Sequence, residues 1–166
     1  MAEQSRPKRL ALDTNVLMDM AAGEEFAKSF VEKYQARGYD LRVPPTVLVE
    51  LAYFATRGEG EKKRLSEIVL KAMRGWRITP IVMSDMERRH RENFVTYVQE
   101  RGLLPPREEH DALILAEVSV SDFNALVTSD GPLLEADHAG MAIAFNDAGL
   151  SPVAIVHPAR MVKALR

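Results

Sequence analysis

Four of the 24 acidic residues occupy positions where a surface carboxylate is not expected; they are Asp13, Glu50, Asp111 and Asp130. Carboxylates that converge on one spot repel one another, and a divalent cation relieves that repulsion. The chain has no cysteine, so hard oxygen donors favour Mg²⁺ or Mn²⁺ over zinc. A cation held in this way can activate water and hold a phosphate for in-line attack, which makes the four acids candidates for catalysis.

Asp13 and Asp130 each follow a short apolar run that is typical of a buried strand. Ligands of open α/β sheets bind at the carboxyl ends of the strands, where both side chains would lie. Both residues also have a structural explanation. Asp13 could cap a helix that begins at Thr14, and Asp130 precedes Gly131-Pro132, where aspartate is common in turns. Taken singly, Asp13 does not decide between a site and a structural role, and for Asp130 the turn explanation is favoured.

Glu50 and Asp111 interrupt the apolar faces of two predicted helices. The faces are Val47, Glu50, Leu51 and Phe54 in one helix, and Asp111, Ile114, Leu115 and Val118 in the other. A buried carboxylate costs several kcal/mol unless it is paired or binds a metal. The alternatives are a buried salt bridge for Glu50 and compensation of the helix dipole for Asp111. Glu117 lies off this face, and we expect it at the surface.

The elements that must position these acids alternate between short β-branched runs and longer helical patterns. This alternation predicts an α/β fold with a mostly parallel sheet. Strands are expected at 8–12, 41–43, 76–82, 125–128 and 153–156, the third at an edge because Pro80 interrupts it. Helices are expected at 14–20, 24–37, 44–56, 61–74, 83–101, 108–120 and 140–148. With no repeat or linker, residues 1–166 are expected to form a single domain, with 1–7 as a flexible N-terminal tail.

Composition excludes several classes of protein. A chain with 46% hydrophobic and 28% charged residues is not expected to be disordered, and one without cysteine has no disulfides or thiolate nucleophiles. The sequence has neither a signal-peptide pattern nor the roughly 20 apolar residues of a membrane span. We therefore expect a cytoplasmic protein with no membrane attachment. The net charge of −2 means that any RNA must be bound through a local basic surface, which favours an enzyme over a coating protein.

A local basic cluster, residues 88–91, lies within the predicted helix 83–101. Arg88 and Arg91 are candidates for RNA contacts, because contacts to phosphate dominate the affinity for nucleic acids. The alternative is a solvated helix face whose charges are balanced by the flanking glutamates.

Four motifs resemble those of PIN domains. They are LDTNVL at 12–17, the segment 46–51 that ends in Glu50-Leu51, HDALILA at 110–116 and LVTSD at 126–130. The similarity runs in the same order from Leu10 to about Val162. It implies a PIN-like three-layer α/β/α fold with a five-stranded sheet of order 3-2-1-4-5. It also implies that Asp13, Glu50, Asp111 and Asp130 form a Mg²⁺ or Mn²⁺ site for RNA cleavage, supported by Asn15 and Thr128.

The resemblance predicts a metal-dependent ribonuclease, and the commonest bacterial role of small PIN domains is that of the toxin in a toxin–antitoxin pair. An RNA-processing nuclease outside such a pair is an alternative, and a non-catalytic scaffold that binds RNA or protein is another. The presence of all four acids argues against the scaffold. Haloacid-dehalogenase phosphatases also begin with a strand-end aspartate, but they need a second one where this chain has Asn15.

The expected partners are an RNA substrate, an antitoxin protein and a second copy of the chain. The helix pair 46–74 is rich in apolar residues, and a domain of this size is not expected to bury them all. An exposed apolar patch marks an interface, so we expect a homodimer. The charged helix 84–101 and the proline-rich loop after it depart from the compact toxin members, and they leave the choice of RNA and partner open.

Overall fold

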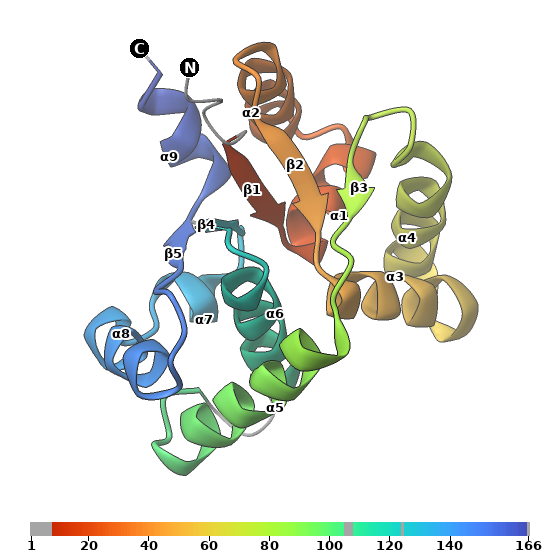
Figure 1. Ribbon diagram of the computed structural model, residues 1–166. Helices are drawn as coiled ribbons and strands as arrows, with labels where there is room; N and C mark the ends of the chain where they lie inside the picture. The colour runs from red at the N-terminus through yellow and green to blue at the C-terminus, as the bar shows by residue number, and fades with distance from the viewer. Residues whose placement is uncertain (1–7, 105–107, 124, 166) are drawn as a thin grey trace.

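Five parallel strands form one sheet in the order β3-β2-β1-β4-β5 (Figure 1). The computed structural model describes residues 8–104, 108–123 and 125–165. The strands are β1 (Arg9–Leu12), β2 (Asp40–Val43), β3 (Thr79–Pro80), β4 (Ala125–Val127) and β5 (Ala154–Val156). Because all neighbours are parallel, the carboxyl ends of the strands lie at one edge of the sheet. The predicted fold class and strand order are confirmed.

Helices connect the strands and lie on both sides of the sheet, with α1 and α2 behind the strands in Figure 1 and α5 paired with α6 on the other side. They are α1 (Thr14–Ala22), α2 (Glu25–Ala36), α3 (Pro45–Arg57), α4 (Gly60–Ala72), α5 (Asp85–Glu100), α6 (Glu109–Val120), α7 (Gly131–Leu134), α8 (His138–Asp147) and α9 (Pro158–Lys163). Within the described ranges, no helix combines the length and apolar character that crossing a membrane requires.

The edge strand β3 differs most from the sequence-based expectation. A strand was predicted over 76–82, but only Thr79 and Pro80 pair with β2. Arg77 has a φ of 56°, so the chain enters this strand from a left-handed conformation, and Pro80 has no N–H to donate. The edge position itself is confirmed. The short helices α7 and α9 were not predicted, and the expected tail 1–7 lies outside the described residues.

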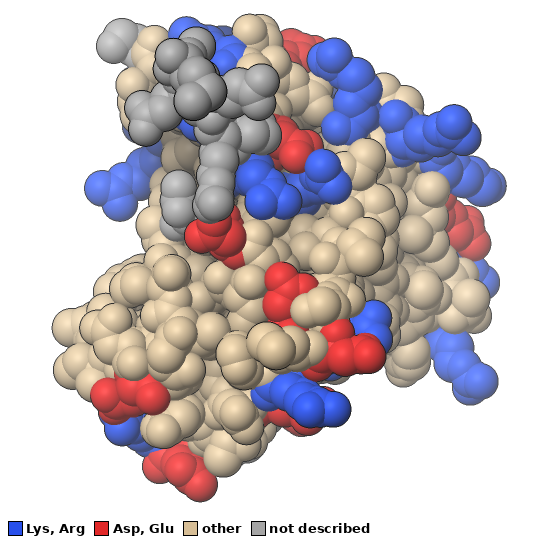
Figure 2. All heavy atoms as spheres, in the orientation of Figure 1, with Lys and Arg blue, Asp and Glu red and all other residues tan. Residues whose placement is uncertain are grey.

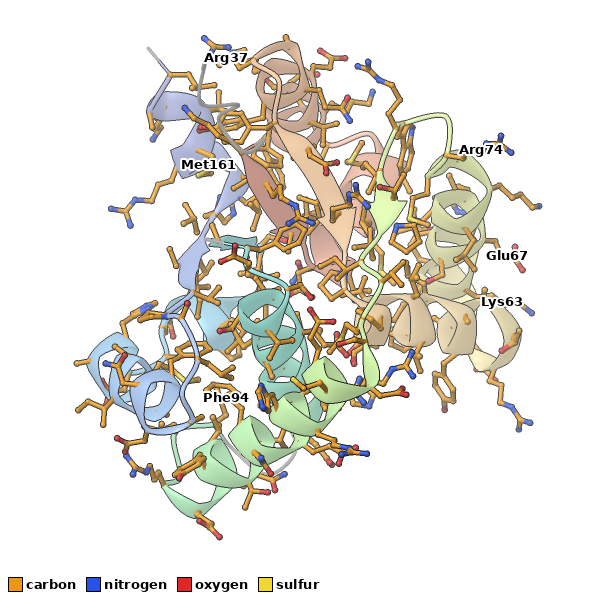
Figure 3. All side chains as sticks on the ribbon, viewed as in Figure 1. Arg37, Lys63, Glu67, Arg74, Phe94 and Met161 are labelled. Carbon is orange, nitrogen blue, oxygen red and sulfur yellow. The ribbon has the colours of Figure 1, made fainter. Side chains whose placement is uncertain are left out.

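Aromatic side chains link pairs of helices that are distant along the chain, α5 with α8 and α2 with α9. Phe94 of α5, labelled in Figure 3, is fully buried and stacks on Phe145 of α8 with ring centroids 4.4 Å apart. Burying such a side chain contributes about 2–3 kcal/mol. In the second pair of helices, the Tyr34 hydroxyl of α2 donates a hydrogen bond to the Met161 carbonyl of α9 at 2.8 Å. These contacts join α5 to α8 and α2 to α9, so that helices distant along the chain are fixed relative to one another.

Candidate active site

A cavity of about 310 Å³ lies at the carboxyl edge of the sheet, where Asp13 follows β1 and Asp130 follows β4. It is lined by Asp13, Thr14, Asn15, Met18, Glu50, Phe54, Lys62, Glu108, Asp111 and Asp130. All the carboxylates that the sequence singled out are among these residues. Two come from strand ends and two from the helices α3 and α6, so residues more than 100 positions apart meet in one place.

Asp13 connects β1 to α1, and its side chain is 4% exposed. One carboxylate oxygen accepts a hydrogen bond from the N–H of Thr14 at 2.8 Å, so the helix cap considered as an alternative is present. The other oxygen accepts from the hydroxyl of Thr128 at 2.7 Å. Burial raises the pKa of Asp13 to about 6 against the opposing effect of these hydrogen bonds, and the charges of Glu50 and Asp130 add to the rise.

Thr128 and Asn15 hold the loop that follows β4. Thr128 is fully buried, and its hydroxyl accepts from the backbone N–H of Asp130 at 3.0 Å while donating to Asp13. The side-chain oxygen of Asn15 accepts from the N–H of Ser129 at 3.2 Å. These bonds orient Asp13 and Asp130 toward the cavity, in keeping with the supporting role that the sequence motifs imply for Asn15 and Thr128.

Asp130 also has the structural role considered for it. Its side chain caps α7 by accepting from the N–H of Leu133 at 3.1 Å. The cap uses one carboxylate oxygen, and the residue still lines the cavity. A cap and a place in the site are therefore compatible at Asp130, as they are at Asp13.

Glu50 reaches the cavity from α3, with its side chain 17% exposed. Its carboxylate accepts a hydrogen bond from the Thr14 hydroxyl, and its other oxygen lies 3.1 Å from Nδ1 of His110. The buried salt bridge to arginine that the sequence allowed is therefore replaced by contacts with Thr14 and His110. Sequence reasoning missed both partners, although each is the direct neighbour of a predicted acid along the chain.

Asp111 lies half-buried in the first turn of α6. Burial raises its pKa to about 8, and the hydrogen bond with Glu108 and the charges of Asp13 and Asp130 act in the same direction. Asp111 lies in the first turn, where the helix dipole favours the charged carboxylate, but burial and the neighbouring acids outweigh this effect and raise the pKa. Glu108 lines the cavity as well, which sequence reasoning did not anticipate.

The chemistry of the cavity suits a hard divalent cation. Burial is the main cause of the raised pKa values of Asp13 and Asp111, and the charges of neighbouring carboxylates add to both. A cation would relieve the repulsion between these charges. Across the described ranges, however, no three Asp, Glu or His side chains form a finished metal-binding group. Each oxygen of Asp13 accepts one hydrogen bond, from Thr14 or from Thr128, and keeps a further lone pair that could face a cation. The donors thus fit Mg²⁺ or Mn²⁺, although their arrangement is not that of a formed metal centre.

Glu117 was predicted at the surface, and this prediction is wrong, because the residue is 0% exposed. Its carboxylate accepts from the N–H and the hydroxyl of Thr46, at 3.0 and 2.6 Å, and from the guanidinium of Arg91 at 3.0 Å. The first turn of α3 has no side-chain cap of its own, since its N-cap is Pro44, and Glu117 supplies the cap from α6. Burial raises the pKa of Glu117, and the bonds from Thr46 and Arg91 oppose that rise. The contact joins α3, which carries Glu50, to the helix that carries Asp111.

The two arginines predicted to contact RNA differ in the structure. Arg91 is 21% exposed and its guanidinium is paired with Glu117, whereas Arg88 is 56% exposed and pairs with Asp85 of the same helix. In Figure 2, Lys and Arg gather at the upper right, over α2 and α4, and acidic and basic side chains are mixed around α5. Arg88 therefore stays a surface candidate, and Arg91 has a structural role.

The fold and the cavity define an α/β protein with an acidic site at the carboxyl edge of a parallel sheet, an arrangement that suits metal-assisted chemistry on phosphate esters. A family model described as "PIN domain" matches residues 10–139, which is most of the chain. The chain belongs to the PIN domain family.

Individual relatives agree with this assignment. The chain is 38% identical over 63 residues to a protein named VapC ribonuclease from Aquifex aeolicus (strain VF5), a match that covers 35% of this chain and 47% of that protein. The chain thus spans about half the length of this relative. The fold of the present chain is similar to that of a chain in the crystal structure of VapBC2 from Rickettsia felis bound to a promoter DNA fragment, with a TM-score of 0.63. The two chains are 18% identical, and the similarity covers 90% of this chain and 98% of that one. VapBC-1 from nontypeable Haemophilus influenzae is also similar in fold, with a TM-score of 0.58, 13% identity and coverage of 90% and 98%.

Proposed function

We propose that the protein is a ribonuclease that depends on Mg²⁺ or Mn²⁺ and hydrolyses phosphodiester bonds of RNA. The observation that carries this proposal is the cavity in which Asp13, Glu50, Asp111 and Asp130 come together at the carboxyl edge of the sheet. Membership of the PIN family and the local similarity to a VapC ribonuclease support it. A non-catalytic scaffold is less well supported, because a protein that only binds RNA has no need of crowded carboxylates with raised pKa values.

The four acids would hold the cation, and the neighbouring polar groups would hold the acids. A bound Mg²⁺ or Mn²⁺ supplies an activated water and neutralises charge on the phosphate. Thr128 keeps Asp13 oriented, Thr14 keeps Glu50 oriented, and Asn15 fixes the loop before Asp130. Positioning of this kind is a large part of catalysis, because misplacing a reacting group by about 1 Å can cost on the order of a hundredfold in rate.

We further propose that the protein acts in the cytoplasm as the toxin of a toxin–antitoxin pair, with an antitoxin protein as its partner. The likeness to chains from VapBC complexes over 90% of this chain supports that partner. A nuclease that processes RNA outside such a pair would have the same site. A neighbouring short gene that encodes a DNA-binding protein would support the toxin, and co-expression should then yield a stable complex of the two proteins.

The proposed activity is tested with a labelled RNA oligonucleotide and the purified full chain. Cleavage should require added Mg²⁺ or Mn²⁺ and should stop in EDTA. A water nucleophile needs no ribose hydroxyl, so the products should carry 5′-phosphate and 3′-hydroxyl ends. Undiminished cleavage in EDTA would refute the metal dependence, and 2′,3′-cyclic phosphate products would refute the water nucleophile.

We also propose a homodimer, based on the apolar surface of α3. Val49 and Tyr53, which share one face of this helix, are 62% and 58% exposed. A contiguous exposed apolar face favours association. Light scattering should give twice the chain mass over a range of protein concentrations, and Tyr53→Glu should shift the mass toward that of one chain. A wild-type mass that stays monomeric at the highest concentration would contradict the homodimer.

A further inference from the structure

Lys62 of α4 is the one positively charged residue among the described residues that line the acidic cavity. The carboxylates that share the lining are Asp13, Glu50, Glu108, Asp111 and Asp130. In the described part of the chain, the ammonium group of Lys62 nevertheless has no carboxylate within ion-pair distance. A lysine that served only to neutralise these acids would be expected to pair with one of them, so another role is needed.

The position of Lys62 within α4 also argues against a purely structural role. It is the third residue of the helix, near the end where the helix dipole disfavours a positive charge. Its Nζ lies 4.2 Å from the ring centroid of Phe54, one turn after Glu50 on α3, and both residues line the cavity. The aromatic ring therefore holds the ammonium group beside the cavity without neutralising its charge.

Other charges of α4 point elsewhere. Figure 3 shows Lys63 and Glu67 projecting from the outer side of this helix at the right of the molecule, away from the strands, and Arg74 just beyond the end of the helix. None of these three residues lines the cavity. Lys71 in the last turn of α4 is exposed and is also absent from the lining, so it provides a matched control for Lys62 on the same helix.

We propose that Lys62 binds an RNA backbone phosphate next to the one that is cleaved, and that Phe54 positions Lys62 for this contact. This inference rests on the proposed ribonuclease function. A polyanion that approaches five carboxylates is repelled, and a lysine at the edge of the cavity offsets that repulsion as a point charge on phosphate. Contacts with phosphate add affinity whatever the base sequence, so Lys62 would help to hold the RNA strand beside the acids.

The test compares Lys62→Gln, Lys62→Arg and Lys71→Gln in two assays on the full chain. Binding of a labelled single-stranded oligoribonucleotide is measured by fluorescence anisotropy at several salt concentrations, in an Asp111→Asn background so that the RNA is not consumed. Cleavage by the same Lys variants with Asp111 intact gives KM and kcat. Phe54→Leu is measured alone and combined with Lys62→Gln.

We expect Lys62→Gln to bind RNA about tenfold more weakly, with the salt dependence of log Kd reduced by about 0.7, as for the loss of one phosphate contact. KM should rise similarly while kcat changes little, and Lys62→Arg should restore most of the affinity. Phe54→Leu should add little to Lys62→Gln, because both changes disrupt the same contact. Replacing Lys62 should change the melting temperature little, since the side chain is exposed and an exposed position usually contributes little to stability.

Each outcome is decisive. Equal affinity and salt dependence for Lys62→Gln and Lys71→Gln would overturn the role of Lys62 while leaving the ribonuclease proposal intact. If the wild type fails to cleave but Lys62→Gln alone weakens binding, the nuclease proposal fails and the phosphate contact stands. Failure of every form to bind RNA would overturn both.

Discussion

The Asp111→Asn protein should cleave RNA more slowly than the wild type by on the order of a thousandfold, which corresponds to about 4 kcal/mol of lost transition-state stabilisation. The carboxamide keeps the shape of the side chain but loses the charge that would hold a divalent cation. Asp13→Asn should have a similar effect, because Asp13 lines the same cavity. Single-turnover cleavage of a labelled oligonucleotide in Mn²⁺ measures both losses.

Asp85→Asn provides the matched control. Asp85 is also a first-turn acid, in α5, but its side chain is 90% exposed and does not line the cavity. Its replacement should leave turnover within about twofold of the wild type, as is usual for an exposed position. Near-normal turnover of Asp111→Asn would remove Asp111 from the proposed site.

The Asp111→Asn protein should also melt at a higher temperature than the wild type in EDTA, so its lost activity cannot reflect lost fold. The pKa of Asp111 is raised in the folded state from 3.8 to about 8. The folded state therefore binds the proton more tightly, and the stability linked to this carboxyl is full below the unfolded pKa and is lost as pH rises through the folded pKa. Asparagine has no such loss, so its advantage should widen between pH 4 and pH 8. Differential scanning fluorimetry across this range checks the sign.

Glu117→Ala should lower the free energy of unfolding by about 3 kcal/mol, because it leaves the guanidinium of Arg91, whose side chain is only 21% exposed, without its counter-ion. It also removes the cap from the first turn of α3, where the N–H of Thr46 loses its acceptor. Denaturation by urea, followed by circular dichroism, measures the change. The loss is a large share of the 5–15 kcal/mol that typically stabilises a domain.

Two variants make this prediction decisive. Glu92→Ala removes an exposed glutamate from α5 and should change stability by less than about 0.5 kcal/mol. Glu117→Gln retains an acceptor for Thr46 but not the charge that faces Arg91, so its stability should lie between those of the wild type and Glu117→Ala. A Glu117→Ala protein as stable as Glu92→Ala would show that the buried contact contributes little.

Short-range patterns predicted a mostly parallel sheet and singled out the four acids, and the resemblance to PIN domains supplied the strand order and the shared site. Apolar runs that end at Asp13 and near Asp130 identify strand ends, and parallel strands bring such ends to one edge. Glu50 and Asp111 were recognisable because a charge interrupts an apolar helical face. The catalytic roles of these residues remain predictions.

The sequence could not reveal contacts between helices that are distant along the chain. Glu117 looks like a surface residue in its own helix, and only the packing of α6 against the start of α3 buries it. The two-residue length of β3 likewise depends on the left-handed turn at Arg77. The only local sign of an unusual role for Lys62 is its positive charge in the first turn of a helix. Its contact with Phe54 could not be predicted, because Phe54 belongs to another helix.

The central place of β1 in the sheet has a consequence for the newly made chain. β1 is synthesised first of the strands, yet one of its two neighbours is β4, and the N–H of Asp13 donates to the carbonyl of Val127 at 3.0 Å. A chain that is still being translated therefore has neither the second neighbour of β1 nor the hydroxyl of Thr128 that orients Asp13. The acidic cavity is completed only after residue 130 has emerged. The proposed nuclease should therefore be inactive toward nearby RNA until this segment of the chain has been synthesised.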